Sequence, residues 1–560
     1  MITNKLMKTK LFTLFLAIMA TNSLWAYDFK YGDLYYEVLN SSTPYTVRVT
    51  KDLSNNNYSG ITTIAIPETV EYNDTTYSVV EINGSAFAHC SSLTSVTIPN
   101  SITKIGQFAF TCCHSLNSIN IPASVTEIGS LAFSYCTSLY SINIPESVED
   151  IGKEAFYKSG IYNDESNWED DALYVDNCLV DIDTDSDKSS FTIKENTRLI
   201  SRLALYEWKS LKKITLPNSV KYISKHAFVS CTSLTSITLS NNLLSIGEDA
   251  FYRCSALKSI TIPNSVTDIG KNAFYECTAL MSITIPNSVT HIGEYAFYSC
   301  SALTSISLSH TLTDIANNTF RWCTSLSSIT LPKNLLTIGS SAFYGCTSLS
   351  SITIPNCVNS IEDQAFGKCS SLISISIPET VTYIGANAFA ETPWYDNQPD
   401  GVLYINNVLY QYKGSMLPNT SIDIKDGTIS ISHKAFEYFN SLISITIPSS
   451  VTFIGYQAFM CCPNLKSVTC KATKIPQIYW STFKEVPLSD ATLYVPMESL
   501  NDYKTTEYWN EFGTILPIGE TAVENVESSN SSSTRKMLHN GQVVILHNDK
   551  SYNIMGQEIK

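Results

Sequence analysis

The sequence is poor in charge, and especially in positive charge. Only 16% of its 560 residues are charged, and 36 Lys and Arg face 51 Asp and Glu, for a formal net charge of −15. Proteins that bind nucleic acid gather Lys and Arg on one face to meet the phosphates. The chain has no such basic cluster, so we expect no nucleic-acid partner.

Catalytic and metal-binding motifs are also missing. The eight histidines are scattered, and the sequence has no H-E-x-x-H, no G-x-S-x-G and no phosphate loop. No C-x-x-C pair stands beside a second such pair or a His pair, as a zinc site requires. The alternating carboxylates of 181–187 lack the Gly and the final Glu of a calcium loop, which favours a solvated acidic loop. We therefore predict no enzymatic activity, no cofactor and no metal.

Apolar runs are short. Lys5, Lys8 and Lys10 precede an apolar stretch over residues 11–20, and Ala26 stands before a polar, Tyr-rich segment. This order predicts a secretory signal peptide over residues 1–26. No later stretch reaches the roughly 18 apolar residues that a membrane span needs, and no Cys beside Ala26 could carry a lipid. We expect an exported protein without a transmembrane helix after cleavage.

What the sequence does contain is a repeat. The phrase A-F-x-x-C-x-x-L-x-S-I-x-I-P-x-S-V-x-x-I-G recurs every 23 residues within three blocks, except that Phe483 follows Phe459 by 24, and this gives sixteen recognisable units. Its aromatic position is filled by Phe87, Phe110, Phe133, Phe156, Leu205, Phe228, Phe251, Phe274, Phe297, Phe320, Phe343, Phe366, Phe389, Phe436, Phe459 and Phe483. In a repeat array each unit contacts only its neighbours, so chain length sets no number of domains.

Each unit is predicted to form one turn of a solenoid. The segment Leu257–Pro263 alternates Ile260 and Ile262 with hydroxyl residues, as in a strand with one buried face. It ends at proline, which lacks the N–H that a strand ladder needs. The Phe, Cys and Leu that follow in the repeat are three residues apart, which favours a single helical or 3-10 turn on the return path.

The repeat resembles the BspA-type leucine-rich repeat of Bacteroides-like surface proteins, over roughly residues 61–483. The resemblance implies an α/β repeat fold: a curved leucine-rich-repeat solenoid with a parallel β-sheet on one face, short helical or 3-10 turns on the return path and β-rich caps. It also implies a secreted or cell-surface protein of a Bacteroidetes-like bacterium. Such a protein would mediate adhesion or ligand recognition, with a surface protein or glycan of a host or neighbouring cell as partner. The alternatives are a structural spacer rod without a specific ligand and an enzyme.

Two segments interrupt the repeat, residues 161–200 and 392–431. Each has the pattern of an inserted β-hairpin, and both contain aromatic residues that we expect the regular surface to lack. Insertions in solenoids often lie on the binding face, although a spacer that fixes the curvature would explain them equally. The first candidates for ligand binding are therefore Trp168, Trp394, Tyr395, Tyr404 and Tyr410.

The outward positions of the strands are a second candidate surface. Nearly all of them are Ser or Thr, so they form a flat hydrogen-bonding face suited to weak, multivalent contact with a glycan or an extended protein. Solubility and strand propensity explain the same pattern without a ligand. The candidates on this face are Ser236, Thr238, Ser259, Thr261, Ser282 and Thr284.

Cysteine follows the repeat. Eleven of the sixteen cysteines stand three residues after a repeat Phe. Export makes disulfides possible, but such a column is better explained by buried free thiols packed in the return turn. The cysteines outside the column are the better candidates for reactivity or pairing: Cys112, Cys178, Cys357, Cys461 and Cys470.

The two ends of the chain differ from the repeat in composition. Residues 27–82 alternate in short segments and predict a β-rich N-terminal cap, before a solenoid over 83–469. A C-terminal cap is expected over 470–519, because an open stack must shield its last turn. Residues 520–534 are polar enough for a linker. Residues 535–560 are similar to the sorting tails of secreted Bacteroidetes proteins, though shorter, and an ordinary structural tail is the alternative.

Overall fold

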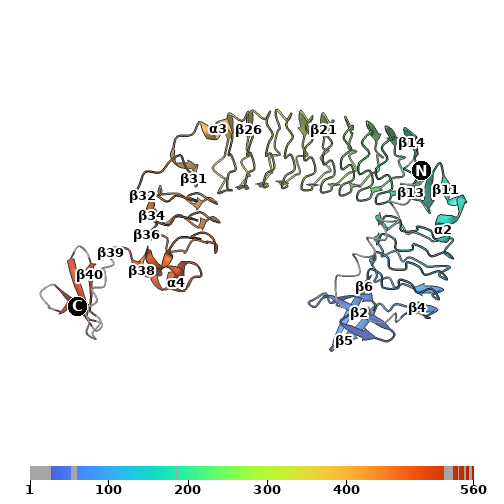
Figure 1. Ribbon diagram of the computed structural model, residues 1–560, viewed down its shortest axis with the longest axis horizontal. Coiled ribbons are helices and arrows are strands. Elements are labelled where there is room, and N and C mark those ends of the chain that lie inside the picture. The colour runs from blue at the N-terminus through green and yellow to red at the C-terminus, as the bar shows by residue number, and fades with distance from the viewer. Residues whose placement is uncertain are drawn as a thin grey trace, which may run out of the picture. The chain divides into compact units, whose positions relative to one another are not determined.

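The computed structural model describes residues 27–51, 58, 60–184 and 186–521, together with the tail strands 534–539, 542–547, 550–553 and 558–559. The predicted signal peptide lies outside these residues. The chain divides into two compact units between Val289 and Thr290. Both units are built from stacked turns with short parallel strands, which confirms the predicted solenoid fold class (Figure 1).

A complete turn contributes two strands, where the repeat pattern predicted one, although some turns have only a bridge or no strand in the first ladder. The predicted strand is represented by β4 (Thr63–Ala65) and β7 (Ser95–Thr97), which pair in parallel. The second strand has two residues and ends at the Ile before the repeat Gly. It is represented by β8 (Lys104–Ile105), β9 (Glu127–Ile128) and β10 (Asp150–Ile151), which pair in parallel with the two Ile residues always opposite each other. The solenoid therefore has two strand ladders.

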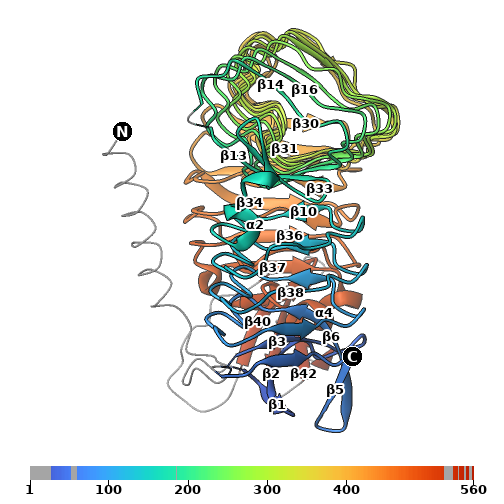
Figure 2. The same cartoon turned by 90° about the vertical axis from the view of Figure 1, so that its right-hand side faces the viewer.

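The first unit starts with a sheet that continues into the second ladder. Its strands are β1 (Phe29–Tyr31), β2 (Leu34–Asn40), β3 (Thr46–Thr50), β5 (Thr69–Tyr72) and β6 (Thr75–Ile82). After the first insertion, the second ladder consists of β13 (Cys178–Ile182), β15 (Leu199–Ile200), β17 (Tyr222–Ile223), β19 (Ser245–Ile246) and β20 (Asp268–Ile269). The first ladder contains β14 (Ser190–Thr192), β16 (Lys213–Thr215) and β18 (Ser236–Thr238), followed by β21 (Ser282–Thr284). Figure 2 shows β14 and β16 in adjacent turns.

The second unit repeats this plan. It begins with β22 (His291–Ile292) and β23 (Ser305–Ser307). Its second ladder holds β24 (Asp314–Ile315), β25 (Thr337–Ile338), β27 (Ser360–Ile361) and β29 (Tyr383–Ile384), and after the insertion β33 (Ser430–Ile431) and β35 (Phe453–Ile454). Its first ladder holds β26 (Ser351–Thr353) and β28 (Ser374–Ser376), then β32 (Thr420–Asp423), β34 (Leu442–Ile447) and β36 (Ser467–Cys470).

Beyond the last repeat, two further parallel strands continue the first ladder. They are β37 (Thr492–Val495) and β38 (Thr514–Pro517), accompanied by the 3-10 turns η3 (Leu488–Asp490), η4 (Met497–Ser499) and η5 (Trp509–Glu511) and by α4 (Leu500–Thr505). The tail strands β39 (Glu520–Thr521), β40 (Thr534–His539), β41 (Gln542–His547), β42 (Lys550–Asn553) and β43 (Glu558–Ile559) pair antiparallel in sequence order. None of the helices within the described parts of the chain is long and apolar enough to cross a membrane.

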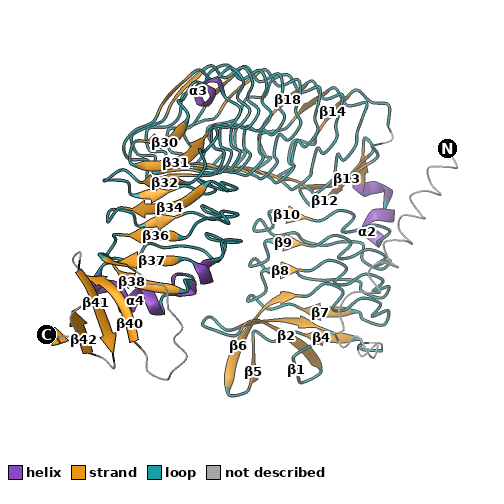
Figure 3. Cartoon of the chain, turned by 60° about the vertical axis from the view of Figure 1, so that its left-hand side comes forward, coloured by secondary structure: helices purple, strands orange, loops and turns teal. Residues whose placement is uncertain are grey.

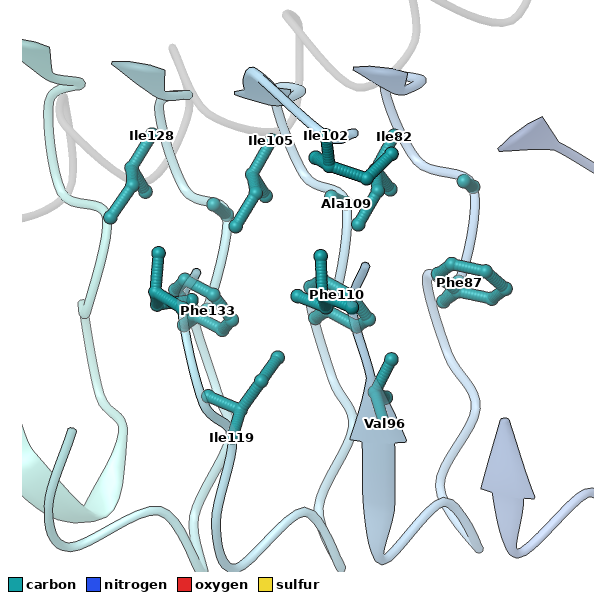
Figure 4. Close-up of a cluster of buried hydrophobic side chains, with 14 of the residues drawn as sticks. Ile82, Phe87, Val96, Ile102, Ile105, Ala109, Phe110, Ile119, Ile128 and Phe133 are labelled. Atoms are coloured by element: carbon teal, nitrogen blue, oxygen red, sulfur yellow. The ribbon is translucent and has the colours of Figure 1, made fainter. Parts of the chain in front are cut away.

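The repeat Phe residues form stacked columns inside each unit, and Figure 4 shows part of the column in the first unit. The rings of Phe87, Phe110 and Phe133 are fully buried, and their centroids are 5.3 and 5.4 Å apart. The isoleucines of the second ladder lie on one side of this column, and Val96 and Ile119 lie on the other. Stacked rings gain a specific attraction beyond the burial of their area. The column therefore fixes the register of each turn on its neighbour.

The return path of the regular repeats is a chain of single turns, and within the described residues an α-helix closely follows a repeat Phe only at the two insertions. The N–H of Cys113 donates to the carbonyl of Phe110 at 3.2 Å, the i to i+3 bond that a 3-10 turn uses. Phe108 and Cys112 have φ of +59°, so the backbone cannot wind on as a helix. The N–H of Phe110 instead donates to Ala132 of the next turn at 2.8 Å. The spacing of three in the sequence reflects these alternating local and inter-turn hydrogen bonds.

The cysteines of the column are buried thiols, as predicted. Its members are Cys90, Cys113, Cys136, Cys231, Cys254, Cys277, Cys300, Cys323, Cys346, Cys369 and Cys462. The Cys277 thiol donates to the carbonyl oxygen of Phe251, one turn back, at 3.2 Å, and the same bond recurs along both units. The thiol thus supplies a hydrogen bond between turns as well as a small side chain. Of the other cysteines, Cys357 is exposed.

Candidate binding surfaces

Both insertions begin where a hydroxyl residue replaces the repeat Cys. The hydroxyls of Ser159 and Thr392 donate to the carbonyl of the preceding repeat Phe at 2.7 and 2.6 Å. They also accept the N–H of Tyr162 at 3.2 Å and of Tyr395 at 3.1 Å, which caps the short helices α2 (Gly160–Asn163) and α3 (Pro393–Asp396). The exchange of Cys for Ser or Thr therefore marks the start of each insertion in the sequence, a signal separate from the loss of the 23-residue period.

The inserted hairpins belong to the solenoid. In the first insertion, η2 (Glu165–Asn167) and β11 (Trp168–Glu169) lead to β12 (Ala172–Val175), which pairs antiparallel with β13. In the second, β30 (Gly401–Ile405) pairs antiparallel with β31 (Val408–Lys413). Figure 3 shows the hairpin strands β12 and β13 and the hairpin strands β30 and β31. The returning strand of each hairpin then joins the second ladder, because β13 pairs with β15 and β31 with β33 in parallel.

The aromatic residues of the insertions serve largely to pack these hairpins. Tyr410 is only 1% exposed, and its hydroxyl accepts the N–H of Phe389 at 3.1 Å. Burial also raises the pKa of its phenol. Its ring cannot meet a ligand on the surface, which corrects its place among the candidates. The half-buried ring of Trp394 packs edge to face on Phe389, with centroids 4.9 Å apart.

The other three insertion aromatics are half-buried and hydrogen-bonded. The indole N–H of Trp168 donates to the carbonyl of Tyr162 at 2.8 Å. The hydroxyls of Tyr395 and Tyr404 accept the Gln411 amide at 2.5 Å and the Lys425 N–H at 3.0 Å. These rings keep some exposed surface, so a role in ligand binding stays a prediction for them and for Trp394.

The hydroxyl candidates of the first ladder line up along the first unit. Isolated parallel bridges join Ser236 to Ser259 and Ser259 to Ser282, so equivalent residues are neighbours in successive turns. Ser236 is half-buried, and the exposed members are Thr238, Ser259, Thr261, Ser282 and Thr284. They form a continuous polar face, and its binding role stays a prediction.

A further surface, which we did not expect from the sequence, follows the turns beside the buried Phe column. The residue after the repeat Phe is a tyrosine in five turns, at Tyr157, Tyr252, Tyr275, Tyr298 and Tyr344, and each of these side chains is partly exposed. In the first unit, the rings of Tyr252 and Tyr275 stack with centroids 4.6 Å apart. The regular surface therefore does contain aromatics, contrary to our expectation. The recurring Phe-Tyr pair was the signal for them.

In the second unit this row contains a compact group that we name the Trp322 platform: Arg321, Trp322, Tyr344 and Lys368. The Arg321 guanidinium lies 4.4 Å from the centroid of the Tyr344 ring, and the Lys368 ammonium lies 5.7 Å from it. Trp322 meets Tyr344 edge to face, with centroids 5.4 Å apart. All four side chains are half-buried, so one side of each faces the turn and another faces solvent.

Two glycines of the following turns make room for these rings. A Cβ on Gly345 would clash with Cε3 of Trp322, and a Cβ on Gly367 would lie 2.9 Å from Cδ2 of Tyr344. Gly345 also has φ of +74°, a conformation that side chains rarely adopt. The indole and the phenol thus lie directly on backbone. Because that contact restricts their rotamers, less conformational entropy is lost when a partner binds.

Solved bacterial leucine-rich-repeat proteins are similar to this chain. One from Bacteroides ovatus is 26% identical, with 88% of this chain and 100% of that chain covered and a TM-score of 0.32. A leucine-rich cell surface protein from Faecalibacterium prausnitzii is 27% identical, with 64% and 95% covered and a TM-score of 0.26. The pneumococcal vaccine antigen PcpA is 17% identical, with 88% and 98% covered and a TM-score of 0.22. No curated protein matches.

The family model described as the BspA type leucine rich repeat region matches residues 56–166, 184–304, 290–416 and 404–506. The matched residues make up more than half of the chain and include both strand ladders and the Phe and Cys columns of each unit. The chain belongs to the family of proteins with BspA-type leucine-rich repeats.

Proposed function

We propose that the protein is an exported, non-enzymatic binding protein of a bacterial surface, which recognises a protein or glycan of a host or neighbouring cell through the outer side of its solenoid. The observation that supports this most is the Trp322 platform. Trp, Tyr and Arg are the residues most enriched at the energetic centres of protein interfaces. In the platform, Arg321 and Trp322 both contact the ring of Tyr344 at the surface.

Export is supported by the N-terminal sequence, in which Lys5, Lys8 and Lys10 precede an apolar run and Ala26. The Faecalibacterium prausnitzii protein that resembles this chain is described as a cell surface protein. A place on a bacterial surface, either anchored or after secretion, agrees with both. The tail over 535–560 is proposed as the sorting or anchoring segment.

Three surfaces are candidates for binding the partner, and we rank them by the chemistry of their side chains. The Trp322 platform combines large aromatic area with cations, and its rings are already held by the next turn. The insertion aromatics come second, because Trp394 packs on Phe389 and the side-chain polar atoms of Trp168, Tyr395 and Tyr404 are already hydrogen-bonded within the insertions. The hydroxyl face comes third, since small hydroxyl side chains give little contact area and suit only weak, multivalent binding.

The test is a binding array of host matrix proteins and glycans, probed with the chain that starts at residue 27. Trp322→Ala combined with Tyr344→Ala should weaken the strongest interaction at least tenfold, about 1.4 kcal/mol, as expected of an interface centre. Trp394→Ala with Tyr395→Ala should weaken it less, and Ser259→Ala with Thr261→Ala should change it little. Tyr140→Ala is the matched control, because this tyrosine is 65% exposed and lies outside all three surfaces.

Three outcomes would contradict this ranking or the proposal. If the insertion pair or the hydroxyl pair proves essential while the platform is dispensable, the choice of surface is wrong. If no component of the array binds saturably, a spacer rod replaces the binder. Turnover of any glycan or peptide on the array would place the protein among enzymes. Circular dichroism and thermal unfolding of each variant separate lost contacts from a lost fold.

A further inference from the structure

A small cavity lies where the last repeat turn meets the C-terminal cap. Its volume is about 220 Å³, and it is lined by Tyr479, Trp480 and the turn that follows them, and by Tyr508 and Glu511 of the cap. It can hold a small organic group and is too small for a helix or a strand.

Aromatic rings form much of the lining. Tyr479, Trp480, Phe483 and Tyr508 all face the cavity. Trp480 is 57% exposed, an unusual state for the largest apolar side chain in a cap that otherwise buries its Trp. Tyr508 has φ of +67° and ψ of −33°, a conformation that residues with a side chain rarely adopt. Such strained residues persist where the surroundings hold them in place, and they cluster at ligand sites.

The charges around the cavity favour a cation. Glu485 and Glu511 contribute two carboxylates to the lining, against the single ammonium of Lys484. The faces of aromatic rings carry negative potential, which adds to that of the carboxylates. Lys484 shows the resulting preference within the chain itself, because its ammonium lies 5.6 Å from the centroid of the Trp480 ring. An anionic ligand would meet two like charges at this site.

We propose that this cavity binds an alkylammonium group, either the end of a lysine side chain or a quaternary ammonium such as choline. The cation rests on the rings of Trp480 and Tyr508, and the carboxylates of Glu485 and Glu511 balance its charge, as in aromatic cages that recognise methylated ammonium groups. Lys484 competes with the ligand for the same ring. The site is separate from the Trp322 platform. The proposal of an ammonium site therefore does not depend on the partner proposed above.

The test is a calorimetric titration of the full chain with choline, with Nα-acetyllysine amide, and with 3,3-dimethyl-1-butanol, the uncharged carbon analogue of choline. At least one of the two cations should bind saturably, and which of them binds more tightly identifies the source of the ammonium. The uncharged analogue should not bind. Trp480→Ala and Glu511→Gln should each weaken cation binding by about three- to thirtyfold, the range of a cation–π contact or a desolvated charge pair. Tyr438→Ala, at an exposed tyrosine of the turn before, should leave it unchanged.

The Lys484→Met variant distinguishes a cation site from a site for an anion or a hydroxyl-rich ligand. Removing the internal ammonium should tighten cation binding several-fold, whereas an anion or a hydroxyl-rich ligand would lose a donor and bind more weakly. Trp480→Phe should retain most of the affinity, which separates loss of the ring from loss of the fold. Equal binding of the uncharged analogue, preferential binding of glucose or galactose in a parallel titration, weaker cation binding in Lys484→Met, or no saturable binding by either cation would each overturn the proposal.

Discussion

At the scale of the residue, the repeat Phe is the largest buried side chain of a regular turn. Phe274 is fully buried and stacks on Phe251 with ring centroids 5.4 Å apart. We expect Phe274→Ala to lower the free energy of unfolding by about 3 to 5 kcal/mol, because it removes a large side chain and leaves a cavity in a packed column. Urea unfolding followed by circular dichroism measures this. Lys271→Ala in the same turn is the exposed control, and an equal loss in both variants would contradict the packing argument.

A second residue-scale prediction concerns the carboxyl of Asp181, on the strand β13 of the first insertion. Burial raises its pKa from 3.8 to about 6, although the N–H of Ile182 donates to it at 2.9 Å. The folded protein therefore holds a proton that the unfolded chain releases, and stability is lost as the pH rises from about 4 through 6. Asp181→Asn should raise the free energy of unfolding by about 1 to 2 kcal/mol at pH 7.5.

The pH dependence is the control for this variant. At pH 4 the native carboxyl is protonated and the unfolded one is about half protonated, so the gain from Asp181→Asn should largely vanish. Urea unfolding at both pH values measures the difference. A gain of the same size at pH 4 and 7.5 would mean that the asparagine acts through new contacts and not through the lost charge.

Residue-level features were predictable from the sequence only where the repeat determines them. The burial of Cys277 follows from its place in a column, whichever turn it belongs to. The orientation of Trp322 does not follow from its place in the repeat. It depends on Gly345 of the next turn, where a side chain would clash with the indole ring. Tyr410 was likewise misjudged, since the sequence gives no sign that its hydroxyl would find the N–H of Phe389.

At the scale of the element, the insertions depend on the hydroxyl residue that opens them. Thr392 donates to one backbone group and accepts from another, so Thr392→Val removes both hydrogen bonds at nearly constant volume. Loss of a helix cap costs about 0.5 to 2 kcal/mol. Hydrogen exchange should therefore speed up over residues 393–413. Thr353→Val, an exposed strand residue, is the control, and unchanged exchange in Thr392→Val would contradict the role of the cap.

Some elements were predictable from the sequence, and others were not. The three-residue strands, such as β7, alternate apolar and polar residues, and this pattern is legible in the sequence. The two-residue strands of the second ladder, such as β8, are too short to show any alternation, so only their stacking in the structure reveals them. The return turns have a spacing of three that also suits a helix. The positive φ angles that prevent a helix there occur at varied residue types, including Phe108 and Cys112, and so leave no signature.

At the scale of the whole molecule, the thiols should be distinguishable by access. Cys357 is exposed, Cys112 and Cys461 are half-buried, and the repeat column is buried throughout both units. Iodoacetamide at a pH of about 8 should therefore label Cys357 first and the column only after unfolding, because the reagent needs an accessible thiolate. Peptide mass spectrometry of the labelled native protein shows directly which cysteines have reacted. Bridges between neighbouring column positions would overturn the assignment of free thiols.

The same column makes the molecule sensitive to alkali. Burial raises the pKa of the column thiols Cys254, Cys277, Cys323, Cys346, Cys369 and Cys462 above the ordinary value of 9.0, to about 12 for Cys369 and Cys462. The folded chain therefore keeps protons that the unfolded chain releases. The stability that depends on these protons is fully present below about pH 9 and is lost as the pH rises toward the folded values.

Each such thiol can lower the free energy of unfolding by up to about 1.4 kcal/mol per pH unit above its unfolded pKa, and several act together. The urea midpoint, measured with reductant present, should be nearly flat from about pH 7 to 8 and fall steeply between about pH 9 and 10. A triple variant Cys254→Ala, Cys277→Ala and Cys369→Ala should be less stable at neutral pH, because it loses three inter-turn hydrogen bonds, yet its midpoint should fall less with pH. Equal slopes in both proteins would mean that groups other than the thiol column control the alkaline unfolding of the solenoid.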